Sequence, residues 1–504
     1  MPDICVRYEP DDFEYDVFTL FQAFFHGSSI KMLKPGEEAG TGHEMFFRVG
    51  KTCSDGGSGT VSVCELDPES GDVLRSSACS LAGLDDRIAR KNELKRCVYR
   101  FLADRCGREL PWGALTGIRP VKLAMQMLEE GQKNSVIAGR LREEYCVSTE
   151  KAALAVATAN REKAVLDTAD FASGYSLYIG IPFCPSICLY CSFGSHELSR
   201  WGKYTEDYLE ALKHELCYIA GEMKDIPLHS VYIGGGTPTT LSAEQLEGLL
   251  AKVTELFDLS GLLEFTVEAG RPDTVTEEKL AVLQKFPVNR ISINPQTMNQ
   301  ETLDLIGRRH TAEDIREKFF LARRMGFRNI NMDLIVGLPG EGKEEVRRTL
   351  EQIRELSPDA LTVHSLALKR ATRLNLFRED YVPVSFENSQ EIMRMTTAAA
   401  AEMGMGPYYL YRQKNMAGNF ENVGYSVPGC AGLYNILIME EKQTIIAAGS
   451  GGSSKFVSQN GKKIERVENV KDLLNYIGRI DEMIERKQKG IDQWRRDMMI
   501  NNPC

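Results

Sequence analysis

The sequence has no long apolar run. Of its 504 residues, 43% are hydrophobic and 26% are charged. No stretch approaches the roughly 20 consecutive apolar residues that cross a bilayer. The start, MPDICVRYEPDDFEYD, is acidic from the outset and lacks the basic start and the apolar stretch of a secretory signal. We therefore expect a cytoplasmic protein with no membrane span.

The sequence also has no excess of positive charge. The formal net charge is -10, which argues against a general affinity for phosphate backbones, so we expect no nucleic acid partner. Chemistry on a small molecule is the better expectation. The chain is also too long for one ordinary domain and long enough to bury several cores.

Most of the 13 cysteines have no close metal-type spacing, and we expect them to be reduced thiols. The exceptions are Cys184, Cys188 and Cys191, which form a C-x3-C-x2-C motif in IPFCPSICLYCSF (181–193). Thiolates in such a loop can hold three irons of a [4Fe-4S] cluster and leave the fourth iron open. A zinc site is the alternative, with His196 as the nearby fourth ligand.

The local composition divides the chain into three regions. In residues 1–168, FFRVG (46–50) and TVSVCEL (60–66) predict strands, and helical spacing begins at Leu84. This N-terminal domain is therefore expected to be α+β in front and helical behind, with an unknown role. Residues 169–380 alternate strands and helices, and residues 381–504 are expected to form a mixed, helix-rich region that covers the substrate.

Short runs of β-branched and aromatic residues alternate with amphipathic helices from Tyr175 onward, which is typical of parallel βα units. The six predicted strands are SLYIGIP (176–182), SVYIGG (230–235), LEFTVEA (263–269), NRISINP (289–295), NINMDLIV (329–336) and ALTVHSLA (360–367). Six units indicate an α/β fold with a partial (βα)6 barrel, since a closed one has eight. Functional residues are expected after the carboxyl ends of these strands.

Polar motifs follow these strands in order. After the second strand, the glycines of IGGGTPT (233–239) would let backbone amides approach a carboxylate closely. Glu268 ends the third strand, and Gln296, Arg308 and Asp333 come from the following units. Each residue alone could be a solvated polar group. Together, at successive strand ends, they predict one cofactor site.

The cysteine motif after the first strand resembles that of the radical S-adenosylmethionine superfamily. The whole series, over residues 170–455, resembles the oxygen-independent coproporphyrinogen III oxidases, also called coproporphyrinogen dehydrogenases, and within them the HemZ-type branch. The resemblance implies that the three cysteines hold a [4Fe-4S] cluster. It also implies that S-adenosylmethionine is bound by Tyr178, Tyr190, Gly235, Gly236, Thr237, Glu268, Gln296, Arg308 and Asp333.

The resemblance further implies an activity. In this family a 5′-deoxyadenosyl radical takes hydrogen from a propionate side chain, and loss of CO2 and one electron leaves a vinyl group. Two such steps convert coproporphyrinogen III to protoporphyrinogen IX, with electrons from a low-potential donor. Arg412, Lys414 and the loop GIRPVK (117–122) are candidates to pair with the substrate carboxylates.

Two positions depart from the best-known oxidases: Phe193 stands where they have a cysteine, and Gly180 stands near the place of a histidine. Two alternatives therefore remain open. One is a heme chaperone of the same family, which needs an axial heme ligand. No histidine follows His364, and this favours the enzyme. The other is a radical enzyme that acts on a different tetrapyrrole.

Overall fold

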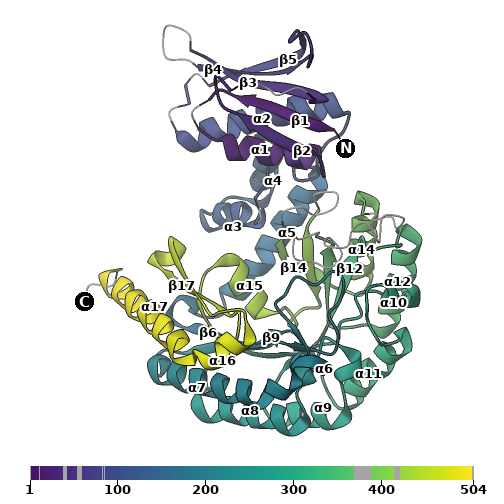
Figure 1. Cartoon of the computed structure of the whole chain (residues 1–504), viewed down its shortest axis with the longest axis vertical. Coiled ribbons are helices and arrows are strands. Elements are labelled where there is room, and N and C mark those ends of the chain that lie inside the picture. The colour runs from purple at the N-terminus through teal and green to yellow at the C-terminus, as the bar shows by residue number, and fades with distance from the viewer. Residues whose placement is uncertain are drawn as a thin grey trace. The chain divides into compact units, whose positions relative to one another are not determined.

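The computed structural model divides the chain into two compact units (Figure 1). The first consists of residues 1–159 and 412–420, and the second of residues 160–411 and 421–504. The structure describes residues 2–10, 12–37, 42–53, 59–81, 83–84, 86–117, 119–367, 388–413 and 420–501. The predicted boundary after residue 168 stays a prediction, and the one after residue 380 lies outside the described residues.

The first unit contains a five-stranded sheet in the order β2-β1-β3-β4-β5 among its described residues. The strands are β1 (Asp3–Tyr8), β2 (Ser29–Leu33), β3 (Met45–Cys53), β4 (Gly59–Leu66) and β5 (Val73–Ser80). β1 runs parallel to both of its neighbours, and β3, β4 and β5 are antiparallel. The strands predicted at 46–50 and 60–66 are confirmed as β3 and β4.

Helices accompany this sheet, as α1 (Glu14–Phe24), α2 (Arg87–Cys106), α3 (Val121–Glu129), α4 (Asn134–Tyr145) and α5 (Thr149–Leu166). α2 begins where the Asp86 side chain accepts a hydrogen bond from the Ala89 amide, and it ends at Gly107 with a φ of 61°. Its buried face packs on the sheet. The centroid of the Phe47 ring, on β3, lies 5.1 Å from that of Phe21 on α1 and 6.3 Å from that of Phe101 on α2. The expected α+β front and helical back are confirmed.

The second unit is built on an 11-stranded sheet among its described residues, in the order β14-β15-β13-β12-β11-β10-β9-β6-β16-β17-β18. Each neighbouring pair from β16 to β13 is parallel. All six predicted strands are present, as β6 (Tyr175–Ile181), β9 (Leu228–Gly235), β10 (Glu264–Glu268), β11 (Arg290–Ser292), β12 (Ile330–Val336) and β13 (Ala360–Ser365). Their side chains are mostly buried, as expected for parallel strands covered on both faces.

The sheet is open, since β14 and β18 stand at its two ends within the described residues. Antiparallel strands extend both sides of the parallel part: β14 (Gly406–Tyr411) and β15 (Asn422–Ser426) beyond β13, and β17 (Ser453–Ser458) and β18 (Lys463–Glu468) beyond β16. The predicted α/β fold with a partial barrel is therefore confirmed.

One parallel strand was not predicted. β16 (Thr444–Ala448) lies beside β6, with Ala448 opposite Ile179. Its five residues are all buried, and it comes from the C-terminal part of the chain. The turn that follows, 449–452, is therefore brought close to the carboxyl end of β6.

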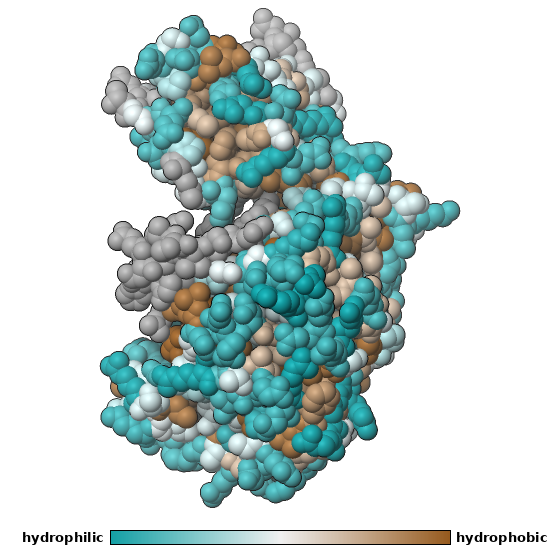
Figure 2. Space-filling view, turned by 90° about the vertical axis from the view of Figure 1, so that its right-hand side faces the viewer, coloured by the Kyte–Doolittle hydropathy of each residue, from teal (hydrophilic) through white to brown (hydrophobic). Residues whose placement is uncertain are grey.

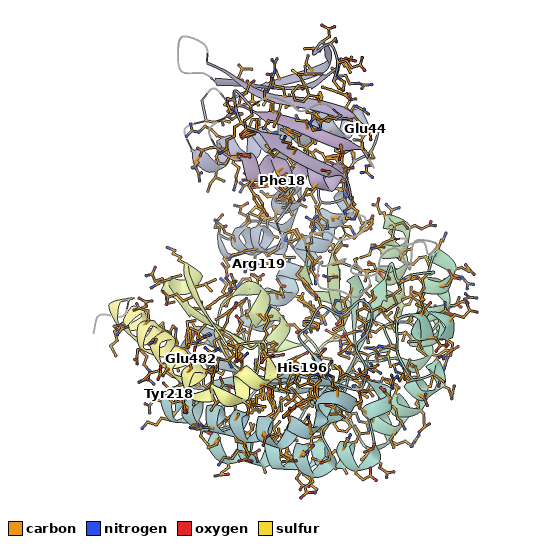
Figure 3. All side chains as sticks on the ribbon, viewed as in Figure 1. Phe18, Glu44, Arg119, His196, Tyr218 and Glu482 are labelled. Atoms are coloured by element: carbon orange, nitrogen blue, oxygen red, sulfur yellow. The ribbon has the colours of Figure 1, made fainter. Side chains whose placement is uncertain are left out.

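Helices α7 to α12 lie outside the parallel strands (Figure 1). They are α7 (Thr205–Met223), α8 (Ala243–Leu256), α9 (Glu277–Gln284), α10 (Gln300–Leu305), α11 (Ala312–Arg324) and α12 (Lys343–Leu356). The C-terminal region adds α14 (Gln390–Glu402), α15 (Leu433–Glu440), α16 (Leu473–Gly478) and α17 (Ile480–Asn501). α17 packs on α7, where Arg495 donates to the Glu222 carbonyl; Figure 3 labels Tyr218 on α7 and Glu482 on α17.

Among the described helices, none combines the length and apolar character that spanning a bilayer requires. Hydrophilic side chains cover most of the coloured surface in the space-filling view (Figure 2).

Candidate active site

The three cysteines of the motif lie in the loop that follows β6. The short strand β7 (Phe183–Cys184) pairs with β8 (His196–Glu197) and closes this loop at its base. Inside it, the Cys191 amide donates to the Cys188 carbonyl at 3.1 Å, so the chain turns back between these two cysteines. His196, labelled in Figure 3, packs against Trp201 with 4.9 Å between ring centroids and the ring planes tilted by 56°.

Burial of the thiols affects their ionisation. It raises the pKa of Cys184, and it raises the pKa of Cys191 to about 11, to which the neighbouring Cys188 also contributes. Within the described ranges, no three His, Cys, Asp or Glu side chains form the ligand set of a single metal ion. Three neighbouring thiols in a shielded loop nevertheless fit an iron-sulfur cluster, because bound iron ionises thiols that would otherwise stay protonated.

Arg271 supports the cysteine loop and was missed by the sequence analysis. Its side chain is 3% exposed, and one guanidinium nitrogen lies 3.6 Å from the Cys188 sulfur. The same group is held by Asp273 at 2.9 Å and by the Ser186 hydroxyl at 3.2 Å. Its position in VEAGRPD, just after the third predicted strand, was the one signal in the sequence that could have found it. The guanidinium places a positive charge beside a thiol that a metal would ionise.

The glycine loop after β9 runs directly against the cysteine loop. The Gly236 amide donates to the Ile181 carbonyl at 2.7 Å, and the Thr237 amide donates to the Phe183 carbonyl at 2.8 Å. A Cβ on Gly236 would lie 2.6 Å from the Phe183 carbonyl oxygen. Thr237 Oγ1 is 3.5 Å from the Cys184 sulfur. Glycine is therefore required here by the close approach of two backbones.

Three tyrosine rings stack beside these loops. Tyr178 of β6 lies 6.2 Å from Tyr232 and 6.1 Å from Tyr434, and the last two are 4.5 Å apart. The Tyr232 hydroxyl donates to Glu268 at 2.5 Å. Burial raises the pKa of Glu268 to about 7, and the nearby Asp333 carboxylate adds to the shift. Tyr434 belongs to α15, and the sequence analysis did not find it.

Gln296 and Asp333 are joined through their backbones. The Gln296 amide donates to the Asp333 carbonyl at 2.9 Å, and the Gln296 carbonyl accepts from the Ile335 amide at 2.9 Å. Gln296 has a φ of 69°, which is unusual for a residue other than glycine. The Asp333 side chain accepts a hydrogen bond from Asn331 at 2.7 Å. Asp333 lies in the middle of β12 and not at its end, which corrects the expected position.

Arg308 connects the cysteine loop to the neighbouring strands. Its guanidinium donates to the Asn294 carbonyl and, at 3.2 Å, to the Tyr190 hydroxyl. It is 6% exposed, and its pKa is raised, with Tyr190 and Cys188 as the main causes that favour the charged form. Arg308 follows α10, so its expected place at a strand end is also corrected. Asn294, which further accepts from the Asp333 amide at 3.2 Å, was missed.

The remaining candidates lie elsewhere. Arg412 belongs to the first unit, where it donates to the Leu115 carbonyl next to the GIRPVK loop. Lys414 is outside the described residues. Phe193 is 72% exposed.

Comparisons with known proteins identify the family. A model of the radical SAM superfamily matches residues 178–353. The chain is 42% identical over 407 residues to the oxygen-independent coproporphyrinogen-III oxidase-like protein HemZ of Bacillus subtilis, covering 80% of this chain and 81% of that protein. It is 32% identical to the heme chaperone HemW of Lactococcus lactis over 319 residues, covering 63% of this chain and 79% of the chaperone.

A solved structure is also similar, that of the coproporphyrinogen III oxidase HemN from Escherichia coli. It has 24% identity and a TM-score of 0.49, and the match covers 64% of this chain and 72% of that one. The relatives establish that the chain belongs to the HemZ-like, oxygen-independent coproporphyrinogen III oxidase family of radical SAM proteins. Members of the radical SAM superfamily use a [4Fe-4S] cluster and S-adenosylmethionine.

Proposed function

We propose that the protein catalyses the oxygen-independent oxidative decarboxylation of coproporphyrinogen III to protoporphyrinogen IX. The observation that carries the proposal is the packing of the cysteine loop against the glycine loop, through the hydrogen bonds from Gly236 and Thr237. The similarity to HemZ, which is named oxidase-like, supports the choice of substrate.

In this proposal Cys184, Cys188 and Cys191 bind three irons of the cluster. Arg271 lies beside Cys188, where it would stabilise the thiolate, and Tyr178 stacks on Tyr232. S-adenosylmethionine contacts are assigned to Tyr178, Tyr190, Gly235, Gly236, Thr237, Glu268, Gln296, Arg308 and Asp333. The carboxylates suit ribose hydroxyls and an amino group, and Arg308 suits a carboxylate.

When bound, the cluster and S-adenosylmethionine would supply a 5′-deoxyadenosyl radical, able to take one hydrogen atom from the β-carbon of a propionate. The carboxylate then leaves as CO2, one electron passes to an acceptor, and a vinyl group remains. Each cleavage of the cofactor consumes one electron, so a low-potential donor is part of the proposal.

The test is product analysis under anaerobic conditions. Reconstituted protein is incubated with coproporphyrinogen III, S-adenosylmethionine and a reductant, and protoporphyrin is measured by mass after oxidation, with 5′-deoxyadenosine and CO2. We expect about four irons per chain. Cys184→Ala should lose iron and products, and Cys217→Ala, on an exposed thiol of α7, should keep both. Stoichiometric zinc with no iron uptake would contradict the proposal.

A heme chaperone is the second candidate, since HemW proteins are among the relatives. The two candidate functions predict different experimental results. Tight, stoichiometric heme binding in an absorbance titration, with an intact cluster and no decarboxylated porphyrin, would favour the chaperone. No histidine follows His364 in the sequence, and this supports the enzyme.

A further inference from the structure

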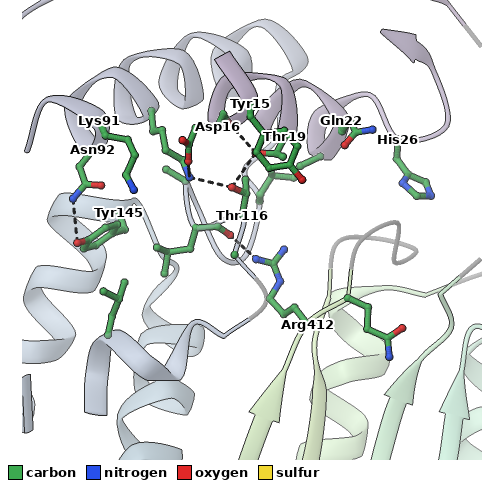
Figure 4. Close-up of a pocket in the computed structure, with 18 of the residues that line it drawn as sticks. Tyr15, Asp16, Thr19, Gln22, His26, Lys91, Asn92, Thr116, Tyr145 and Arg412 are labelled. Atoms are coloured by element: carbon green, nitrogen blue, oxygen red, sulfur yellow. Dashed lines mark hydrogen bonds and ion pairs between the residues drawn. The ribbon is translucent and has the colours of Figure 1, made fainter. Parts of the chain in front are cut away.

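The first unit contains a cavity of about 870 Å³ (Figure 4). The lining residues that the structure describes all belong to this unit, mainly to α1, α2 and the segment 110–117. Its size lies within the usual range of ligand pockets, roughly 300 to 1,000 Å³. Nothing in the proposed chemistry of the barrel uses it.

Positive charge is concentrated around this cavity. Among its described lining residues, four are basic, namely Lys91, Lys95, Arg108 and Arg412, whereas Asp16 is the one carboxylate. Lys95 is 9% exposed and lies 3.5 Å from Asp16 and 3.0 Å from the Thr116 hydroxyl. Burial lowers the pKa of Lys95; the Asp16 carboxylate opposes this shift, whereas the charges of Lys91 and Arg412 add to it. An anion in the cavity would relieve this repulsion, in a chain whose net charge is -10.

Apolar side chains complete the lining. Tyr15 and Ile88 are 58% and 61% exposed, which is unusual for large hydrophobic residues, and both border the cavity. Leu110, Leu115 and Leu123 add further apolar surface. Figure 4 shows Lys91 and Asn92 on α2, and Tyr15 and Asp16 on α1. Cationic groups beside apolar surface suit a ligand that has carboxylates on an apolar body.

We propose that this cavity of the first unit binds a carboxylate-bearing tetrapyrrole. The choice of a tetrapyrrole rests on the proposed function, which brings such molecules to the protein; the cavity itself supplies the argument for an amphipathic anion. Lys91 and Lys95 would face the propionates, and Tyr15 and Ile88 would contact the macrocycle.

The experiment is a binding titration of the full-length, reconstituted protein with coproporphyrin III, followed by fluorescence quenching. Lys91→Glu should weaken binding at least about tenfold, because an attraction becomes a repulsion. Ile88→Asp should weaken it similarly, since it places a carboxylate at the cavity border. The matched control is Lys31→Glu, an exposed lysine on β2 of the same unit, and it should bind as the wild type does.

Iron content and circular dichroism establish that each variant is folded, and Lys91→Gln, with a smaller expected loss, replaces Lys91→Glu if that variant does not fold. Wild-type affinity in both cavity variants, or an equal loss in Lys31→Glu, would overturn the proposal. The titration measures binding and not turnover, so the two proposals can fail separately. If the cavity variants weaken binding of coproporphyrin III but the protein forms no protoporphyrinogen, only the proposed function is contradicted. If the protein forms protoporphyrinogen but the cavity variants bind coproporphyrin III as the wild type does, the cavity proposal is contradicted and the proposed function is not.

Discussion

Lys487 Nζ lies 2.7 Å from Glu215 Oε1, and both side chains are completely buried. The pair joins α17 to α7. The same carboxylate accepts hydrogen bonds from the Gly449 amide at 2.8 Å and from the Tyr476 hydroxyl at 2.6 Å. A Cβ on Gly449 would lie 2.5 Å from the Gly180 carbonyl oxygen, in the strand that leads to the cysteine loop. The C-terminal helix therefore helps to position the start of that loop.

Removal of the Lys487 charge should be strongly destabilising. Lys487→Met leaves the Glu215 carboxylate buried without its cation, and we expect a loss of about 3–5 kcal/mol in the free energy of unfolding. Chemical denaturation followed by circular dichroism measures it. Lys489→Met, on an exposed position of the same helix, should change the free energy by less than about 0.5 kcal/mol. If the two variants lose the same free energy of unfolding, the buried ion pair does not contribute specifically to stability.

The packing of the two loops predicts a sharp difference between two glycines. Gly236→Ala forces a methyl group against the Phe183 carbonyl, so we expect a loss of about 1–3 kcal/mol and reduced iron content after reconstitution. Gly248 lies in α8, where nothing stands within 4 Å of the place that a methyl group would take, and Gly248→Ala should stabilise the helix by about 0.5–1 kcal/mol. Normal iron uptake by Gly236→Ala would argue against this role of the contact.

The assigned cofactor contacts should affect S-adenosylmethionine and not the cluster. We expect Arg308→Ala and Asp333→Ala to keep the absorbance of the cluster and to bind the cofactor roughly a hundredfold more weakly, as is common when a charged partner is removed from a buried site. Equilibrium binding and 5′-deoxyadenosine formation measure the effect. Arg309→Ala is the control, since Arg309 is exposed. If both variants bind and cleave the cofactor normally, the two residues are structural.

The ionisation of Glu268 should make stability depend on pH. Its pKa in the folded protein is raised from the usual 4.5 to about 7, chiefly by burial. The protonated group is therefore favoured in the folded state, and its contribution is fully present below about pH 4.5 and lost as the pH rises through about 7. The groups that act on it are Tyr232, Asp333 and Arg290.

Glu268→Gln removes this titration. Between about pH 5 and about pH 8, the wild type should lose melting temperature relative to the variant. Thermal unfolding at both pH values, with Glu255→Gln on the surface as a control, measures the difference. A melting-temperature difference that does not change with pH would mean that Glu268 titrates normally.

The sequence by itself determined the parts of the protein that are local. The C-x3-C-x2-C motif lies within one loop, so its spacing alone places the three cysteines in one short segment. The parallel strands were recognisable because burial on both faces requires short, nearly continuous apolar runs. IGGGTPT was recognisable for a similar reason, because several glycines in succession permit a close approach of backbones.

Only the tertiary structure decided which distant side chains join the site. Arg271 reaches Cys188, Tyr434 stacks on Tyr232, and β16 pairs with β6, and in each case the partners are far apart in the sequence or belong to different βα units. The backbone hydrogen bond from the Gln296 amide to the Asp333 carbonyl likewise joins two different βα units. Strand pairing and side-chain packing set these contacts, and neither follows from the composition of a single segment.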